Sequence, residues 1–74
     1  MSVMSQIDQL KPGQHFIGVS EGLRGHFVVV YWINPEMGGF VEPYDSYTMS
    51  YATRDEAVEM ARIVASEESL PLFV

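Results

Sequence analysis

The sequence contains no cysteine. This absence excludes disulfide bonds, thiolate nucleophiles and cysteine-ligated metal sites. Long hydrophobic runs are also missing, since the longest, Phe27 to Ile33, falls far short of the roughly 20 residues that a membrane-spanning helix needs. The first residues lack the basic flank and the apolar stretch of a signal peptide. We therefore expect a cytoplasmic protein that does not bind membranes.

Positive charge is scarce. Four lysine and arginine residues face ten aspartate and glutamate residues, which gives a net charge of −6. Lys11 is the only lysine and the three arginines are scattered, so the sequence has no basic stripe. An acidic chain repels phosphate backbones. We therefore expect no direct contact with nucleic acid.

Motifs for catalysis are missing as well. His15 and His26 are the only histidines, and neither has a partner at a recognisable metal-ligand spacing. No serine lies in a Gly-x-Ser-x-Gly turn, and Gly38-Gly39 lacks the lysine and helix of a phosphate loop. A domain this small also has little room for a concave pocket. The sequence therefore predicts a non-enzymatic protein with no catalytic residues, no cofactor and no metal.

What the sequence does contain predicts a single α+β domain spanning residues 1–74. Apolar residues make up 47% of the chain, which suits a globular protein. Ser5 and Asp8 are expected to cap a short N-terminal helix that ends at Pro12-Gly13. The fold class is a small antiparallel sheet of three to four strands packed by one C-terminal helix, with the short N-terminal helix before it. The expected strands are residues 14–20, 26–33, 40–42 and 47–52.

Turn and helix signals set the expected boundaries. Residues 21–25 and 34–39 contain paired glycines and are expected to be hairpin connections, and Pro43 is expected to end the third strand. Thr53 and Glu56 form a capping box for a helix that runs to about Ser66 or Glu67. That helix should bury Ala57, Met60, Ala61 and Val64, flanked by Val58 and Ala65. Glu68 would fall on the apolar face, so we expect the helix to end before it. Residues 70–74 then form an edge strand or lie on the core.

The first candidate surface for a partner is acidic. Asp55 and Glu59 lie one turn apart on the outer side of the predicted helix, and Arg62 is the only basic residue near them. Charge on such a face also serves solubility, which is the alternative interpretation. The candidate partner-binding residues are Glu36, Glu42, Asp45, Asp55, Glu56, Glu59, Glu67 and Glu68.

The second candidate surface is apolar. Both faces of the strand from Phe27 to Ile33 are apolar, and such strands are normally covered on both sides. One helix can cover one face of a small sheet. The other face is covered either by the chain termini or by a second chain, because tyrosine and tryptophan are enriched in interfaces. The residues of this apolar interface are expected to be Tyr31, Trp32, Tyr47, Tyr51 and Ile63.

In size, lack of cysteine and number of acids, among them Asp55, Glu56 and Glu59, the chain resembles small acidic phage-encoded inhibitors of the anti-CRISPR type. The resemblance is one of overall character and rests on no signature motif. It implies an inhibitor whose carboxylates take the place of phosphates on a basic, nucleic-acid-binding protein surface. The alternative is a homodimeric structural or adaptor module that associates through an aromatic sheet face.

Overall fold

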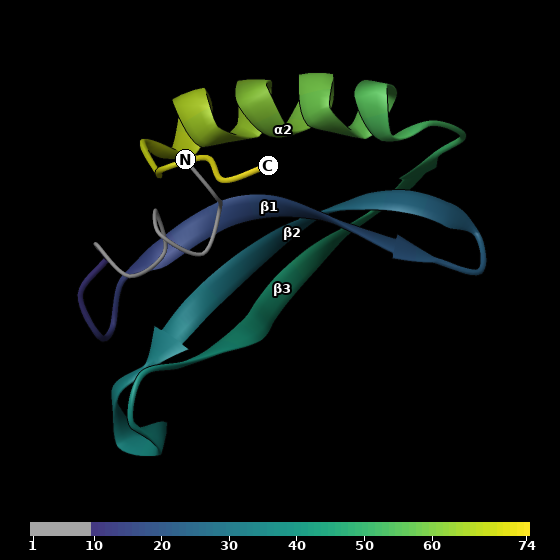
Figure 1. Cartoon of the computed structure of the whole chain (residues 1–74). Helices are drawn as coiled ribbons and strands as arrows, with labels where there is room; N and C mark the ends of the chain where they lie inside the picture. The colour runs from purple at the N-terminus through teal and green to yellow at the C-terminus, as the bar shows by residue number, and fades with distance from the viewer. Residues whose placement is uncertain (1–9) are drawn as a thin grey trace.

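The computed structural model describes residues 10–74, without the side chain of Met37, as one antiparallel sheet and one helix (Figure 1). The strands lie in the order β1-β2-β3, and the helix crosses one face of the sheet. This confirms the α+β class, an antiparallel sheet of three strands and the C-terminal helix. The predicted N-terminal helix lies outside the described residues. The elements are β1 (His15–Gly22), β2 (Gly25–Asn34), the 3-10 helix η1 (Pro35–Met37), β3 (Phe40–Tyr51) and α2 (Arg54–Glu68).

Glycine permits both connections between the strands. The β1–β2 hairpin closes where Gly22 pairs with Gly25. Gly25 has a φ of 120°, and a Cβ there would lie 2.5 Å from the carbonyl oxygen of Tyr51 on β3. The β2–β3 connection begins at Asn34, whose Oδ1 accepts the amide of Glu36 at 2.9 Å. The 3-10 helix of this connection ends at Gly38, whose φ of 71° is left-handed.

β3 differs from the prediction. The two short strands expected at residues 40–42 and 47–52 are one strand, Phe40–Tyr51, and the described residues contain no fourth strand. Pro43 does not end the strand because β3 is an edge strand, where a missing N–H need not cost a ladder hydrogen bond. The register also shifts between Val30 and Tyr31, where Tyr31 pairs with Pro43, so a local irregularity accommodates the proline.

The main core lies between α2 and the sheet. Ile17 and Val28 are fully buried there, against Ala61, Val64 and Ala65 of the helix. The helical spacing of these residues confirms the predicted buried face, with Met60 partly buried beside it. The helix packs mostly on β1 and β2 and least on β3. β3 is therefore left largely uncovered on the side that the helix occupies.

Both ends of α2 are capped. Thr53 accepts the amide of Glu56 at 3.3 Å, which confirms the N-cap half of the capping box. The Glu56 carboxylate reaches back to accept the Thr53 hydroxyl at 3.1 Å rather than its backbone amide. At the other end Ser69 adopts a left-handed conformation with a φ of 55° and closes the last turn. The expected end before Glu68 is wrong by one to two residues. The last turn reaches beyond the core to the edge of a surface pocket, so the Glu68 carboxylate is not forced into apolar surroundings.

The C-terminal tail combines the two expected possibilities. It runs beside β1 (Figure 1), where Ile17 donates its amide to Pro71 at 2.8 Å and accepts the amide of Phe73 at 2.9 Å. The pairing is a single parallel bridge between Ile17 and Leu72 rather than a strand. Leu70 and Leu72 pack against the main core. The tail thus covers the free edge of β1 at Ile17, close to the start of the strand.

The sheet face away from α2 carries an aromatic cluster. Phe16 stacks on Tyr31, with ring centroids 5.2 Å apart, and Phe73 meets Phe16 edge-on at 5.4 Å. A Cβ at Gly18 would lie 2.8 Å from the Tyr31 ring, so glycine permits this packing. The tail therefore covers part of this face, which is the alternative in which the chain termini, rather than a second chain, cover it.

Candidate binding site

β3 carries most of the exposed apolar surface. Of the seven large hydrophobic side chains that are exposed in the described part of the chain, five belong to this strand. Phe40 is 68% exposed and Met49 is 63% exposed. We call these five residues the β3 surface: Phe40, Val41, Tyr44, Tyr47 and Met49.

The fold explains this exposure. β3 lies at the edge of the sheet, and α2 is displaced toward β1 and β2. Every residue of β3 is exposed to solvent except Glu42 and Tyr51, which are half-buried. Tyr51 is packed against the core under the helix. Edge strands with long apolar exposure are sites of association in native proteins. The β3 surface is therefore a candidate interface.

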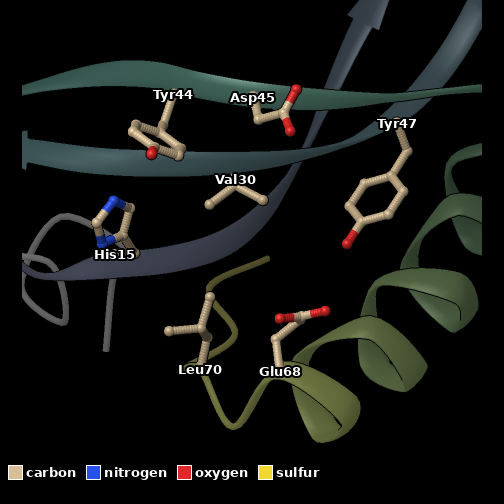
Figure 2. Close-up of a pocket in the computed structure, with 7 residues that line it drawn as sticks. All are labelled: His15, Val30, Tyr44, Asp45, Tyr47, Glu68 and Leu70. Carbon is tan, nitrogen blue, oxygen red and sulfur yellow. The ribbon is translucent and has the colours of Figure 1, made fainter.

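A pocket opens between β3 and the C-terminal end of α2. Its volume is about 410 Å³, which lies within the range of small-ligand and side-chain pockets. Val30 and Leu70 supply its apolar walls. Figure 2 shows Asp45 entering from the strand and Glu68 from the helix end, on opposite sides of the space. The lining residues are His15, Val30, Tyr44, Asp45, Tyr47, Glu68 and Leu70.

Aromatic rings form one end of this pocket. His15 and Tyr44 meet edge-on, with ring centroids 4.7 Å apart. The ring centroid of Trp32 lies 6.3 Å from that of His15 and 6.4 Å from that of Tyr44, so the three rings form a triangle in which Trp32 is outside the pocket lining. His15, Tyr44 and Trp32 come from three different strands, so the sheet pairing holds them together. The ring of Trp32, the only tryptophan, is thereby a reporter of this end of the pocket.

The other end of the pocket is negatively charged. Burial of the Tyr47 ring raises the pKa of its phenol, and the nearby carboxylates of Glu68, Asp45 and Glu67 raise it further, in that order. Figure 2 shows the Tyr47 hydroxyl turned toward Glu68 at the end of α2. The pKa shift shows that three of the predicted acids act on one point. Asp45 and Glu68 line the pocket together with Tyr47, and Glu67 acts on the same phenol from outside the lining.

The other predicted acids do not join them. Glu36 belongs to η1, at the end of the molecule opposite α2 (Figure 1). Glu42 is half-buried and accepts the side-chain amide of Asn34 at 2.9 Å. Glu56 is held in the capping box, and Glu59 lies 3.8 Å from Arg62 in an exposed ion pair. Asp55 occupies the first, positive turn of the helix. The eight acids thus occupy several surfaces.

The predicted apolar interface is also divided. Tyr31 lies in the aromatic cluster away from α2, whereas Trp32 pairs with His15 on the helix side. Tyr51 is packed under the helix, and Ile63 is exposed on its outer side. Only Tyr47 belongs to the β3 surface. The uncovered sheet face was expected to carry Tyr31 or Trp32. Tyr31 lies there and its neighbour Trp32 points to the other face, as alternation requires. Tyr51 was also considered for the uncovered face, and its packing against the core places it on the helix side.

Sequence reasoning missed His15, Tyr44 and Met49 as site residues. Alternation within residues 47–52 already placed Met49 beside Tyr47, so this residue was within reach of the pattern. The contact of Tyr44 with His15 depends on the irregular register of β3 around Pro43. No periodicity in the sequence signals a bulge of this kind.

A second, shallower hollow of about 460 Å³ lies near the β1–β2 turn. Its lining includes Glu21 and Arg24, whose opposite charges favour no ligand of one sign. Its other lining residues are mostly small or apolar. The hollow therefore lacks the convergent chemistry of the pocket beside α2.

Among residues 10–74, no group of three or more histidine, aspartate or glutamate side chains is placed to hold a metal ion. No helix in the same part of the chain is long and apolar enough to cross a membrane. Comparison with known protein families, with curated proteins and with solved structures finds no match to this chain.

Proposed function

We propose that the chain is a non-enzymatic binding protein that docks an acidic surface on a basic surface of a partner protein. In its more specific form, the partner is a nucleic-acid-binding complex that the chain inhibits by occupying its basic channel, as the likeness to anti-CRISPR inhibitors implies. The observation that carries the proposal is the unbalanced charge. The chain has a net charge of −6, and the described residues contain a single ion pair, Arg62 with Glu59.

The distribution of the negative charge supports a local acidic binding surface rather than charge spread evenly over the molecule. Asp45 and Glu68 line one pocket beside Tyr47, and with Glu67 they raise the pKa of its phenol. The last turn of α2 contains no basic residue, although cations are the favourable charge at a helix C-terminus. Glu67 and Glu68 therefore occupy positions where they contribute little to helix stability. A role in binding accounts for acids at these positions.

The test measures binding to a basic probe as salt is raised. A capped nona-arginine peptide serves as the probe, titrated against the whole chain at low, physiological and high sodium chloride. Affinity should fall steeply, because the screening length shrinks from about 10 Å at 0.1 M to about 3 Å at 1 M. Absence of binding at low salt, or affinity that does not change with salt, would contradict the proposal.

A charge-reversal variant separates binding from folding. Glu67→Lys with Glu68→Lys places cations at the helix C-terminus, where they favour the helix, so the variant should fold at least as stably. Its affinity for the peptide should fall by at least about tenfold, a change of about 1.4 kcal/mol. Reversing Glu56 and Glu59 instead would be a less clean test, because the Glu56 carboxylate accepts the hydroxyl of the N-cap residue Thr53.

The second candidate function is a homodimeric module joined through the β3 surface. The observation that favours it is the exposure of five apolar side chains on one edge strand. It predicts a dimer in solution whose dissociation constant is insensitive to salt. Tyr47→Asp should give a monomer, and Tyr31→Asp should not, because Tyr31 lies on the other face. A wild-type chain that stays monomeric at all concentrations in light scattering would exclude this function.

A further inference from the structure

We propose that the pocket between β3 and α2 receives one cationic side chain, an arginine or a lysine, of the partner protein, while the β3 surface packs against apolar groups around it. The inference rests on the proposed function and specifies it: it names the part of the acidic surface that binds and the side chain that it selects. Two independent observations lead to it. One is the charge and shape of the pocket, and the other is the apolar exposure of β3.

The pocket offers the groups that a guanidinium or ammonium ion requires. Asp45 and Glu68 present carboxylates from opposite sides of the space, as Figure 2 shows. The structure gives Glu68 no hydrogen bond or ion pair among the described residues, and Asp45 accepts only the amide of Ser46 at 2.8 Å. A cation between them would be paired on both sides. Charge-assisted hydrogen bonds of this kind are about twice as strong as neutral ones.

The aromatic end of the pocket has the same preference. Tyr44 and Tyr47 present ring faces and edges to the space, and rings attract a cation that lies within about 6 Å of the centroid. Val30 and Leu70 provide the apolar wall along which the methylene groups of a long basic side chain can lie. His15 is the only basic group that lines the pocket. The lining therefore matches an apolar stem with a charged tip.

The β3 surface indicates that the cation belongs to a protein. Tyr44 and Tyr47 line the pocket and are also members of the exposed apolar set on β3. A free small ion would leave Phe40 and Met49 in water, whereas a protein surface that carries the basic side chain covers them. The pocket is then the specific centre of a larger apolar contact. Interfaces commonly have this arrangement, with a few anchors that dominate the affinity.

Charge argues against a second copy of the chain as the occupant. An identical partner would bring its own Asp45, Glu67 and Glu68 toward the same acids, because a two-fold interface repeats one patch on both sides. Each copy carries a net charge of −6, so the contact would also work against long-range repulsion. A basic partner brings neither like charges into the contact nor long-range repulsion.

The experiment uses two capped tripeptides, acetyl-Val-Arg-Val-amide and the same peptide with citrulline in place of arginine. Citrulline keeps the shape of arginine and removes its charge. Binding is followed by the fluorescence of Trp32, whose ring neighbours the pocket residues His15 and Tyr44, and by chemical shifts of the β3 amides. We expect the arginine peptide to bind at least about tenfold more tightly, in line with one desolvated cation contact. Equal binding of the two peptides would overturn the inference.

A pair of charge-matched variants tests the location. Asp45→Asn with Glu68→Gln removes two charges from the pocket, and Glu21→Gln with Glu36→Gln removes two charges from exposed positions outside it. The first variant should lose at least about tenfold in affinity for the arginine peptide, and the second should lose less than about threefold. Equal losses would show that only the overall charge matters.

The outcomes distinguish this inference from the proposed function. If nona-arginine binds in a salt-dependent way but the pocket variant and its control behave alike, the pocket is not the site and the acidic binding function stands. If neither nona-arginine nor the arginine tripeptide binds, the inference and the proposed function both fail. A salt-insensitive dimer that quenches or shifts Trp32 fluorescence, and that Tyr44→Asp dissociates, would assign the β3 surface to a second copy and overturn the inference.

Discussion

The buried side of β1 allows a prediction whose size follows from the structure. Ile17 is fully buried under α2, and Ile63 is 51% exposed on the outer side of the same helix. Replacing each by valine deletes one methylene from the same residue type, so the two variants differ only in surroundings. Ile17→Val should cost about 1 kcal/mol of unfolding free energy, within the range of about 0.5–1.5 kcal/mol for buried sites. Ile63→Val should stay within about 0.5 kcal/mol.

These differences are large for a chain of this size. With 74 residues, the whole unfolding free energy is about 4–11 kcal/mol at roughly 0.05–0.15 kcal/mol per residue. A loss of 1 kcal/mol should lower the melting temperature by about 4–8 °C. Ile17→Ala should lose about 3 kcal/mol and leave a chain that is partly unfolded at physiological temperature. The backbone bonds of Ile17 to Pro71 and Phe73 remain in both variants, so the loss reports packing.

Urea and thermal unfolding followed by circular dichroism provide the measurement. Valine retains the preference of isoleucine for strands, so a change in local propensity does not enter the Ile17→Val result. The Ile63→Val variant is the control for general effects of substitution. Equal melting temperatures for Ile17→Val and Ile63→Val would refute the placement of the core between β1 and α2.

Two further predictions follow from single positions. Gly25→Ala should lower the unfolding free energy by about 3 kcal/mol or more, because its Cβ would lie 2.5 Å from the Tyr51 carbonyl oxygen at a φ of 120°. Gly38→Ala, with nothing within 4 Å of its Cβ, should lower it by only about 1 kcal/mol. Equal losses of the two variants in urea unfolding would contradict this. Tyr47 should ionise at a higher pH than an ordinary tyrosine, because burial and then Glu68, Asp45 and Glu67 raise its pKa. The folded chain holds this proton longer than the unfolded chain, so the contribution of Tyr47 to stability is present below the ordinary tyrosine pKa and is lost as the pH rises through the folded pKa. Ultraviolet titration of tyrosinate, with Tyr47→Phe to assign the signal, should show the pKa falling in Asp45→Asn with Glu68→Gln, and an unchanged titration would count against the convergence of charge.

Local signals predicted most of the fold. The capping box at Thr53 and the spacing of Ala57, Ala61 and Val64 were sufficient for α2, because both depend on contacts within one or two turns. The hairpin at Gly22 and Gly25 is equally local. Pro43 misled the prediction, since its effect depends on whether the strand lies at an edge or in the centre of the sheet. That distinction is set by strand order, which no short window of sequence contains.

The candidate site depended on such non-local information. Asp45 and Glu68 are separated by a whole helix in the sequence, and their approach follows from where the end of α2 meets the sheet. The list of acids predicted from the sequence included both residues but could not separate them from Glu36 or Asp55. The contact between His15 and Tyr44 depends on an irregular register and had no sequence signal.

The tail that pairs with β1 also limits what the chain can assemble into. A three-stranded sheet has two edges, and here the bridge between Ile17 and Leu72 occupies one of them. The tail bonds to β1 at Ile17 only, but there it stands in the way of a strand that would pair along this edge, so among the described residues β3 is the more open edge for strand addition. Removing residues 70–74 would free the second edge as well.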